Sequence, residues 1–446
     1  MPLFDPQALN PGVRRREVLA WAGYDFANSG YTTVVLTAVF NTYFVGVVAQ
    51  RADWATFAWT LALSISNALV MVSLPMIGAY ADLRARKKRV LAASTVGCVL
   101  ATAALALAGR GDLAIAGAAI VASNFFFMVG VGMIAAFLPE LARSEALGKV
   151  SGWGWSFGYL GGLLTLGICL AYVLSAQSRG ESAEQFVPIT MLIVAAVFAL
   201  ASAPTLVILK ERAVPQAGAD VTGYAMASLR RLWQTLRQAR RYRDFAALLA
   251  CGTLYQAGVS VVIALAAIYA QDVMKFTFVQ TMTLILVVNI TAAIGAFGFG
   301  YAQDRLGHRR ALALTLIGWI AMTWIAGMAT GQAMFWVAAN IAGLCMGSSQ
   351  SAGRAMVGLF APRDRLAEFY GLWMLATQFA SIIGPLTYGL VTLLTDNNHR
   401  LGILVTGIFF FVGLMLIALI NVTRGQVAAQ GAPQSPPLQF ARPAPI

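Results

Sequence analysis

Long apolar runs recur along this whole chain and constrain its fold more than any other feature. Each run is on the order of 20 residues, enough as a helix to cross a hydrocarbon core about 30 Å thick. Continuous blocks favour membrane helices over a transmembrane β-barrel, whose strands show short alternating segments. The runs lie at 18–48, 57–80, 90–108, 113–138, 150–175, 187–209, 245–270, 279–302, 311–329, 333–358, 369–394 and 401–421. The sequence therefore predicts an all-α membrane protein with twelve transmembrane helices.

The charges support this prediction and orient it. Only 11% of the residues are charged, and the net charge is +13, which in a soluble protein would suggest a nucleic-acid partner. With the N-terminus in the cytoplasm, 25 of the 31 Lys and Arg residues fall on the cytoplasmic side and five on the other, while Arg354 lies within a span. This is the positive-inside rule. We therefore expect both termini in the cytoplasm and contact with membrane lipids, but no nucleic acid.

The two halves of the chain repeat each other. The stretch NALVMVSLPMIGAYADLRARKK (67–88) matches NITAAIGAFGFGYAQDRLGHRR (289–310), 222 residues later. The shift is half the chain, and both copies follow an even-numbered span. Parallel six-helix repeats with a substrate site between them are a transporter plan. We therefore predict two pseudo-symmetric six-helix bundles, at 1–209 and 245–421.

The segments outside these bundles are polar. Residues 210–244 carry apolar side chains at helical spacing among many Arg residues, which predicts an amphipathic cytoplasmic connector on the membrane surface. One interpretation is that the connector serves only to let the halves move. The other is that it also senses lipid. The tail, 422–446, has five Pro in its last fourteen residues and is predicted to be disordered.

The repeated loop has a chemistry suited to a cytoplasmic gate. Its glycines let helix ends approach closely, and its aspartates can cap a helix or pair with the basic cluster. Ordinary positive-inside charge is the alternative, but two copies at a half-chain shift argue against it. The gate residues are Gly78, Asp82, Arg86, Lys87, Gly300, Asp304, Arg305 and Arg309.

This loop resembles the signature of the major facilitator superfamily, Gly-x-x-x-Asp-Arg-x-Gly-Arg-Arg. The second copy keeps Gly300, Asp304, Arg305, Gly307, Arg309 and Arg310, while the first has Leu83 and Ala85 in place of the Arg and the Gly. The blocks WAGYDFANSGY (21–31), FLPELARSEALGKVSGWGWSFGYLGG (137–162) and GSSQSAGRAMVGLFAPRDRLAEFYG (347–371) resemble the vacuole-effluxer branch, which includes many bacterial members. The resemblance implies the major facilitator fold and export of small solutes, amino acids in the characterised cases. Where the branch often has an acid in the seventh span, this chain has Ala257.

A polar stripe in the first span marks a candidate site. Asp25, Asn28, Ser29 and Thr32 are spaced i, i+3, i+4 and i+7, which puts them on one helix face. Arg354 in the tenth span lies at a similar depth, and such charges usually face a bundle interior. Asp25 could bind a proton, form an ion pair or gate with Arg354, or take the ammonium of a solute whose carboxylate Arg354 clamps. Arg354 could also extend to the inner headgroups.

Other polar residues are candidates for lining the same cavity. By analogy with the superfamily, spans 1, 4, 7 and 10 surround it; hydrogen bonding between helices is the alternative for each amide. The candidates are Tyr24, Asn124, Tyr255, Gln256, Asn340 and Gln350. In the fifth span, Gly154, Gly158 and Gly162 form a small-residue ladder, which favours close helix packing over a hinge.

The chain lacks nucleotide-binding motifs, zinc-ligand spacing and a nucleophile–base set, and its four Cys show no paired spacing. We therefore expect no enzyme activity, cofactor or metal. The predicted function is secondary active transport: export of an amino acid or similar organic solute by alternating access, with proton coupling through Asp25 as an option. The alternatives are a carrier for an anionic or lipid-like solute, and a non-transporting receptor or scaffold. A monomer in the bacterial inner membrane is expected, with a small-molecule substrate and protons as partners.

Overall fold

The computed structural model describes residues 6–143, 147–212, 223, 226, 230, 242–362 and 366–430. Apart from one isolated bridge between Leu9 and Ala142, the regular structure of these residues is helical. The N-terminal half contains η1 (Pro6–Ala8), α1 (Arg15–Tyr31), η2 (Thr32–Ala38), α2 (Phe40–Tyr43), η3 (Phe44–Val48), α3 (Ala55–Leu83), α4 (Lys87–Ala104), η4 (Leu105–Leu107), α5 (Leu113–Ala135), α6 (Leu138–Leu141), α7 (Leu147–Ser178) and α8 (Ala183–Ile208). The C-terminal half contains α10 (Arg243–Asp272), α11 (Phe278–Leu306), α12 (His308–Met328), α13 (Gln332–Phe360), α14 (Leu366–Leu394), α15 (His399–Ala418) and α16 (Val422–Gln430).

The long helices match the predicted spans closely. Among the described residues, eleven helical segments are long and apolar enough to cross a membrane. The tenth predicted span, 333–358, corresponds to α13, a helix of 29 residues that is not among the eleven, so a count of twelve stays a prediction. Large apolar side chains such as Val72, Leu200 and Val207, which are 73–78% exposed, cover the outside of the bundle, as expected where lipid replaces water. The chain is thus an integral, multi-pass membrane protein.

The first span is irregular along its length. It runs from Arg15 to Val48, but the α-helix gives way to π-helical turns in η2 and η3. Such π-helical turns are rare in proteins, and those that exist are frequently found at functional sites. They take up the extra residues of a run that is too long for a straight crossing.

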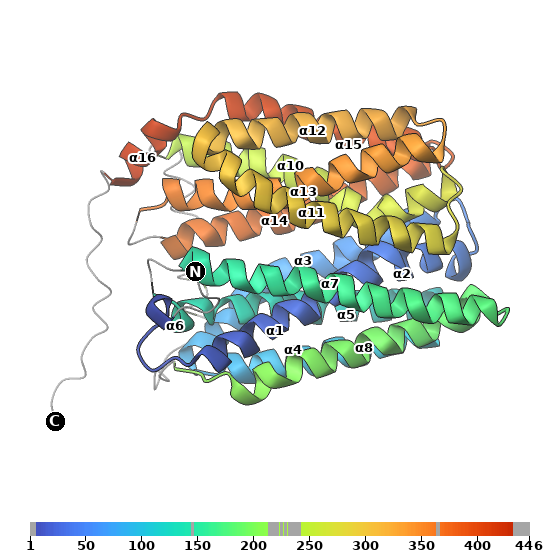
Figure 1. Cartoon of the computed structure of the whole chain (residues 1–446), viewed down its shortest axis with the longest axis horizontal. Coiled ribbons are helices and arrows are strands. Elements are labelled where there is room, and N and C mark those ends of the chain that lie inside the picture. Colours follow the sequence, from blue (N-terminus) through green and yellow to red (C-terminus); the bar gives the residue numbers. More distant parts are fainter. Residues whose placement is uncertain are drawn as a thin grey trace.

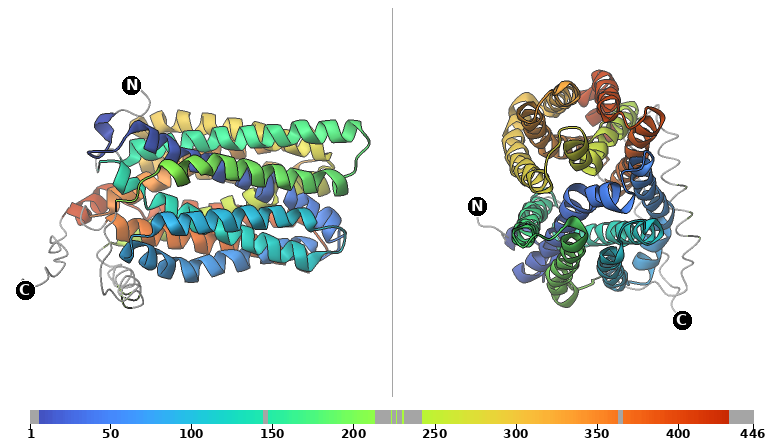
Figure 2. Two further views of the ribbon diagram at one scale, coloured as in Figure 1. Left: turned by 90° about the horizontal axis from the view of Figure 1, so that it is seen from below. Right: turned by 90° about the vertical axis from the view of Figure 1, so that its right-hand side faces the viewer.

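The helices form two groups that lie side by side (Figures 1 and 2). The groups meet where α3 packs against α14 and where α7 packs against α11. We call the end of the bundle that carries loops 49–54, 108–112, 179–182, 273–277, 329–331 and 395–398 the distal face. The opposite end, which carries η1 and α16, is the terminal face (Figure 2).

The structure corrects the prediction for the tail. Residues Val422–Gln430 form helix α16, so the expectation of disorder from 422 onward was wrong for this stretch; the rest of the tail lies outside the described residues. Arg424 holds α16 in place because its guanidinium makes two hydrogen bonds, of 2.7 and 2.6 Å, to the Asp244 carboxylate. Most of the predicted connector at 210–244 also lies outside the described residues.

Candidate functional site

The polar stripe of the first span packs against the glycine ladder of α7. A Cβ on Gly154 would overlap Oδ2 of Asp25, and one on Gly158 would lie 2.8 Å from the Ser29 hydroxyl. Gly161 is tighter still, because a Cβ there would meet the main chain of Phe26. The ladder therefore serves close packing, and Asp25 lies half-buried at the seam between α1 and α7.

Asn28 and Thr32 lie on the same stripe, one and two turns beyond Asp25. Asn28 is buried, at 7% exposure, and its Oδ1 has no hydrogen-bond partner among the described residues. The Thr32 hydroxyl donates to the main-chain oxygen of Asn28 over 3.1 Å, immediately before the π-helical turns. An unpaired acceptor beside a widened helix is suited to a donor group on a solute, because buried polar atoms normally have partners.

Tyr24 points the other way from the stripe. Its hydroxyl lies 2.9 Å from Oγ1 of Thr95 on α4, and its ring meets Phe198 of α8 edge-on. These contacts all fall within the N-terminal half. The Tyr24 hydroxyl therefore makes a contact between helices. This was the alternative considered for the amides, whereas Tyr24 was expected from the sequence to line the cavity.

Two amides of the C-terminal half bond to each other. Gln256 of α10 and Gln350 of α13 exchange hydrogen bonds of 3.0 and 3.1 Å through their side chains. Nearby, the Tyr255 hydroxyl donates to the main-chain oxygen of Ser349 over 3.5 Å. Asn340 instead donates to its own helix, at the Trp336 carbonyl. The structure thus brings Gln256 and Gln350 together and leaves Asn340 apart from them.

Asn124 begins a polar path that crosses from one half to the other. Its amide donates to Oγ of Ser66 over 3.0 Å and lies 3.5 Å from Oδ1 of Asn67. Asn67 in turn donates to the main-chain oxygen of Ser381 on α14 over 3.4 Å, and the Ser381 hydroxyl lies 3.1 Å from that of Ser260 on α10. The sequence analysis missed Ser66, Ser260 and Ser381; Asn67 could have been found, because the repeat aligns it with Asn289.

Further hydrogen bonds join the halves at the distal face. Asn41 and Trp59, from the first and second spans, both donate to the main-chain oxygen of Ala264 on α10, over 3.2 and 3.3 Å. Asn397 donates to Asp53 over 3.2 Å. The described hydrogen bonds between the halves therefore lie at the distal face and at mid-span.

The first copy of the gate motif is held by two acids, Glu140 and Glu211, which were not predicted from the sequence. The Lys87 ammonium lies 3.1 Å from Oε1 of Glu140, and its main-chain N–H donates to Glu211 over 2.6 Å. Glu211 thereby caps the N-terminus of α4, where a negative charge is stabilising. Arg86 donates to the Tyr80 hydroxyl over 2.7 Å. Glu140 could have been predicted from the sequence, because it lies in the block 137–162 that carries the family resemblance.

The remaining gate residues are less fully described. Gly78 lies in α3 with open space around it. Arg309 donates to the Ala418 carbonyl at the end of α15 over 3.1 Å. The side chains of Asp82, Asp304, Arg305 and Arg354, and the surroundings of Gly300, lie outside the description. Pairing of Asp25 with Arg354 is therefore still a prediction.

The terminal face carries ion pairs at the ends of both halves. Arg212 pairs with the buried Glu17 over 2.8 Å, and Arg424 pairs with Asp244. The hydrogen bond to Asp244 raises the pKa of the Arg424 guanidinium, so it stays charged at any physiological pH. Among the described residues, no group of three or more His, Cys, Asp or Glu side chains could hold a metal ion.

Comparison with known proteins identifies the family. The model of the vacuole effluxer Atg22-like family matches residues 41–430. The chain belongs to this family. It is 24% identical over 406 residues to an uncharacterized MFS-type transporter, YxiO, of Bacillus subtilis, covering 90% of this chain and 94% of that protein. It is 26% identical over 333 residues to autophagy-related protein 22 of Kluyveromyces lactis, covering 70% and 65%.

Solved structures share the fold at lower identity. A bacterial homologue of the human lysosomal transporter Spinster, in an inward-facing and unoccupied conformation, gives a TM-score of 0.65 at 14% identity over 94% of this chain and 98% of that one. The nucleoside transporter NupG gives 0.62 at 15% identity over 91% and 97%. The family match and these folds together support a transporter of the major-facilitator type.

Proposed function

We propose that this protein is a secondary active transporter that exports an amino acid or a similar small organic solute by alternating access. The two halves, 1–209 and 245–421, would rock about a central site, and the repeated loops would gate the terminal face. In the proposed topology this face is cytoplasmic and the membrane is the bacterial inner membrane. The family's description as effluxers supports the direction of transport.

One observation carries this proposal: the position of the hydrogen bonds between the halves. Asn41 and Trp59 hold α10 at the distal face through a single carbonyl oxygen, that of Ala264. At mid-span the contacts between the halves are also single hydrogen bonds. The Ser64 hydroxyl, for example, donates to the Ile382 carbonyl. Single polar contacts of this kind can break one after another at the distal face, which rocking about a central site requires.

The site chemistry supports a zwitterionic or polar solute. Asp25 and the unpaired Oδ1 of Asn28 offer acceptors for an ammonium or amide group, and Arg354 on α13 would supply the cation for a carboxylate. Ion pairing between Asp25 and Arg354 in the absence of solute, and proton binding by Asp25, are the competing roles. All three keep Asp25 at the centre of the mechanism.

Flux into and out of liposomes tests the function. Purified protein is reconstituted, radiolabelled amino acids, nucleosides and organic acids are supplied in turn, and a pH gradient is imposed. We expect saturable flux of one solute class, competed by its analogues. Absence of flux for every solute, together with absence of any ligand-induced thermal shift, would support a receptor or scaffold instead.

The role of Asp25 is tested separately. Asp25→Asn keeps the shape of the side chain and removes its charge and its proton. We expect exchange to continue at equal pH while accumulation driven by a pH gradient is lost. Ser29→Ala, one turn away on the same seam, is the control. If Asp25→Asn still accumulates solute against its gradient, Asp25 is not the coupling site.

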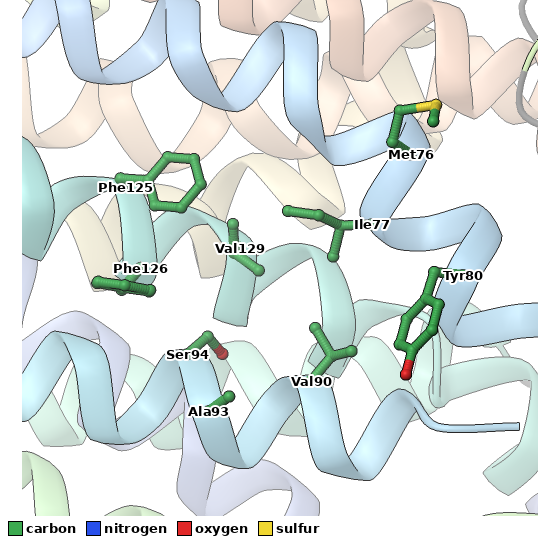
Figure 3. A pocket seen from close by; sticks show the side chains of 9 residues that line it. All are labelled: Met76, Ile77, Tyr80, Val90, Ala93, Ser94, Phe125, Phe126 and Val129. Carbon is green, nitrogen blue, oxygen red and sulfur yellow. The ribbon is translucent and has the colours of Figure 1, made fainter. Parts of the chain in front are cut away.

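One observation favours the second candidate, a carrier for a lipid-like solute. An open groove of about 470 Å³ lies between α3, α4 and α5, with Met76 and Tyr80 on one side and Phe125, Phe126 and Val129 on another (Figure 3). Its lining is almost wholly apolar, and Arg86 lies at the Tyr80 end. Adding a fluorescent fatty acid and a lysophospholipid to the solute panel tests this candidate directly.

A further inference from the structure

A cluster of ionisable side chains lies on the distal face, away from the polar groups at mid-span. Asp272 is the last residue of α10 and His399 the first of α15. Nε2 of His399 lies 4.0 Å from Oδ2 of Asp272, and Nδ1 lies 3.1 Å from the hydroxyl of Tyr388 on α14. His399 is only 6% exposed. The adjacent Gln271 adds a buried Nε2 without a hydrogen-bond partner among the described residues.

Counting protons shows that this geometry suits a charged imidazole. The Tyr388 hydroxyl lies 3.4 Å from the main-chain oxygen of His399, which can only accept. A hydroxyl that donates there must accept from Nδ1–H, and Nε2 of a neutral ring then presents a lone pair to the carboxylate of Asp272. In the other neutral tautomer Nδ1 carries no proton, so the Tyr388 hydroxyl donates to Nδ1. The hydroxyl then has no proton left to donate to the main-chain oxygen of His399. A second ring proton lets Nδ1–H donate to the hydroxyl while a positive ring faces the Asp272 carboxylate 4.0 Å away.

The charges around the pair come from both halves of the protein. Lys275 donates to the Asp272 carbonyl over 2.6 Å, and the charges of Lys275 and Arg51 both act on the Asp272 carboxylate. On α10, Tyr269 lies near Arg400, whose guanidinium donates to a main-chain carbonyl of α12 over 2.9 Å. Arg51 is the member of this set that belongs to the N-terminal half.

Arg51 therefore places the cluster at the contact between the halves. Its loop is held in an unusual conformation, with φ of 53° at Gln50 and 56° at Arg51, a region that residues with side chains rarely adopt. Two residues on, Asp53 accepts the hydrogen bond from Asn397. The loop thus presents a cation and a carboxylate to the C-terminal half, where Asp53 bonds to a residue two positions before His399.

We propose that His399 and Asp272 form a proton-binding site on the distal face, and that proton binding there weakens the attachment of the Arg51 loop to the C-terminal half. A proton on His399 makes an imidazolium whose charge offsets the negative charge by which Asp272 attracts Arg51. A proton on Asp272 removes the carboxylate charge altogether. Acid at the distal face favours separation of the halves there in both cases.

This inference rests on the proposed function, because it supplies the ion that an exporter would exchange for its solute. In the proposed topology the distal face is outside. Protons from outside would then favour the outward-open state, in which the central site is open to them. Among residues that titrate between about pH 5 and 8, histidine is the usual choice, and this chain has two.

The distance between the halves at the distal face tests the proposal without any solute. Spin labels on Arg110→Cys and Thr330→Cys, both at exposed distal positions, report this distance by double electron–electron resonance in nanodiscs. The four native Cys are buried and are replaced by Ser or Ala beforehand. We expect the longer-distance population to grow when the pH falls from about 8 to about 5.

Four variants define the outcome. Asp272→Asn should abolish the pH response, because both proton positions act through its carboxylate, and His399→Gln should reduce the response. His308→Gln, at the other histidine, should keep it. Arg51→Gln changes an exposed side chain, so it should fold normally and show the longer distance at both pH values. A response that survives Asp272→Asn or is unchanged in His399→Gln, or an Arg51→Gln protein that stays closed, overturns the proposal even if transport is found. A response lost as expected in a protein without transport would uphold the site and refute the exporter.

Discussion

The carboxylate of Asp25 on α1 lies directly against Gly154 on α7, in space that a methyl group at residue 154 would occupy. The acid in the first span therefore depends on a glycine from another span for its position. The indole of Trp21, which also borders Gly154, is fixed by a hydrogen bond of 2.9 Å to the Ile134 carbonyl. A methyl group at residue 154 would therefore meet both the carboxylate and the indole ring.

Gly154→Ala should therefore impair both transport and stability. The added methyl displaces the Asp25 carboxylate and also presses on the Trp21 ring, which the hydrogen bond to Ile134 holds in place. We expect a lower maximal rate of solute exchange in liposomes and a lower melting temperature than that of the parent. Unchanged exchange kinetics would mean that the position of Asp25 does not matter for transport.

Gly161→Ala should lower stability, because its methyl meets the main chain of Phe26, which cannot turn aside. Overpacking of this kind costs about 1–3 kcal/mol. Gly167→Ala on the same helix is the matched control, since nothing lies within 4 Å of its Cβ position. A thermal-shift assay in detergent should show a clear loss of stability for Gly161→Ala alone.

Gln256 and Gln350 should be energetically coupled. Each single Leu substitution leaves the other amide without its reciprocal partner in a buried position, whereas the double variant removes both. We expect the double variant to lose less stability than the sum of the singles, with a coupling of about 0.6–1.7 kcal/mol. Additive losses would show that the two amides do not depend on each other.

Removing the donors to Ala264 should favour separation of the halves at the distal face. The double variant Asn41→Leu with Trp59→Phe leaves that carbonyl without the two donors that join the halves. The Arg110→Cys and Thr330→Cys labels should then report a larger long-distance population. Asn289→Leu is the control, because that amide bonds within its own helix. If the double variant and the parent give the same distance distribution, other contacts hold the halves together at the distal face.

Arg424→Gln should release α16 from the terminal face. The variant removes both charge-assisted hydrogen bonds to Asp244, and α16 is a short helix of 9 residues, too short to persist in water by itself. Hydrogen exchange at residues 422–430 should become several-fold faster, with exchange in α15 unchanged. Retained protection would mean that packing of Phe360 against Gly425 is enough to hold the helix.

The structure bears on two of the interpretations that were made from spacing along a helix. The ladder at Gly154 and Gly158 was expected to serve close packing, and it does. Tyr24 was grouped with the cavity beside Asp25, yet its hydroxyl bonds to Thr95 inside the N-terminal half. Adjacent residues on a helix point about 100° apart, so sequence proximity to Asp25 could not decide where Tyr24 faces.

The sequence by itself determined the class of fold: apolar runs of span length, the half-chain repeat and the placement of basic residues predicted a helical membrane protein in two similar halves. These are local properties, since a segment must satisfy its own backbone hydrogen bonds and match the bilayer before it meets any neighbour. Only the tertiary structure decided which polar groups meet. Gln256 and Gln350 are 94 residues apart, and His399 finds Asp272 only because the ends of α10 and α15 share a face. Such pairs depend on helix rotation and depth, which packing between helices sets and which no single segment encodes.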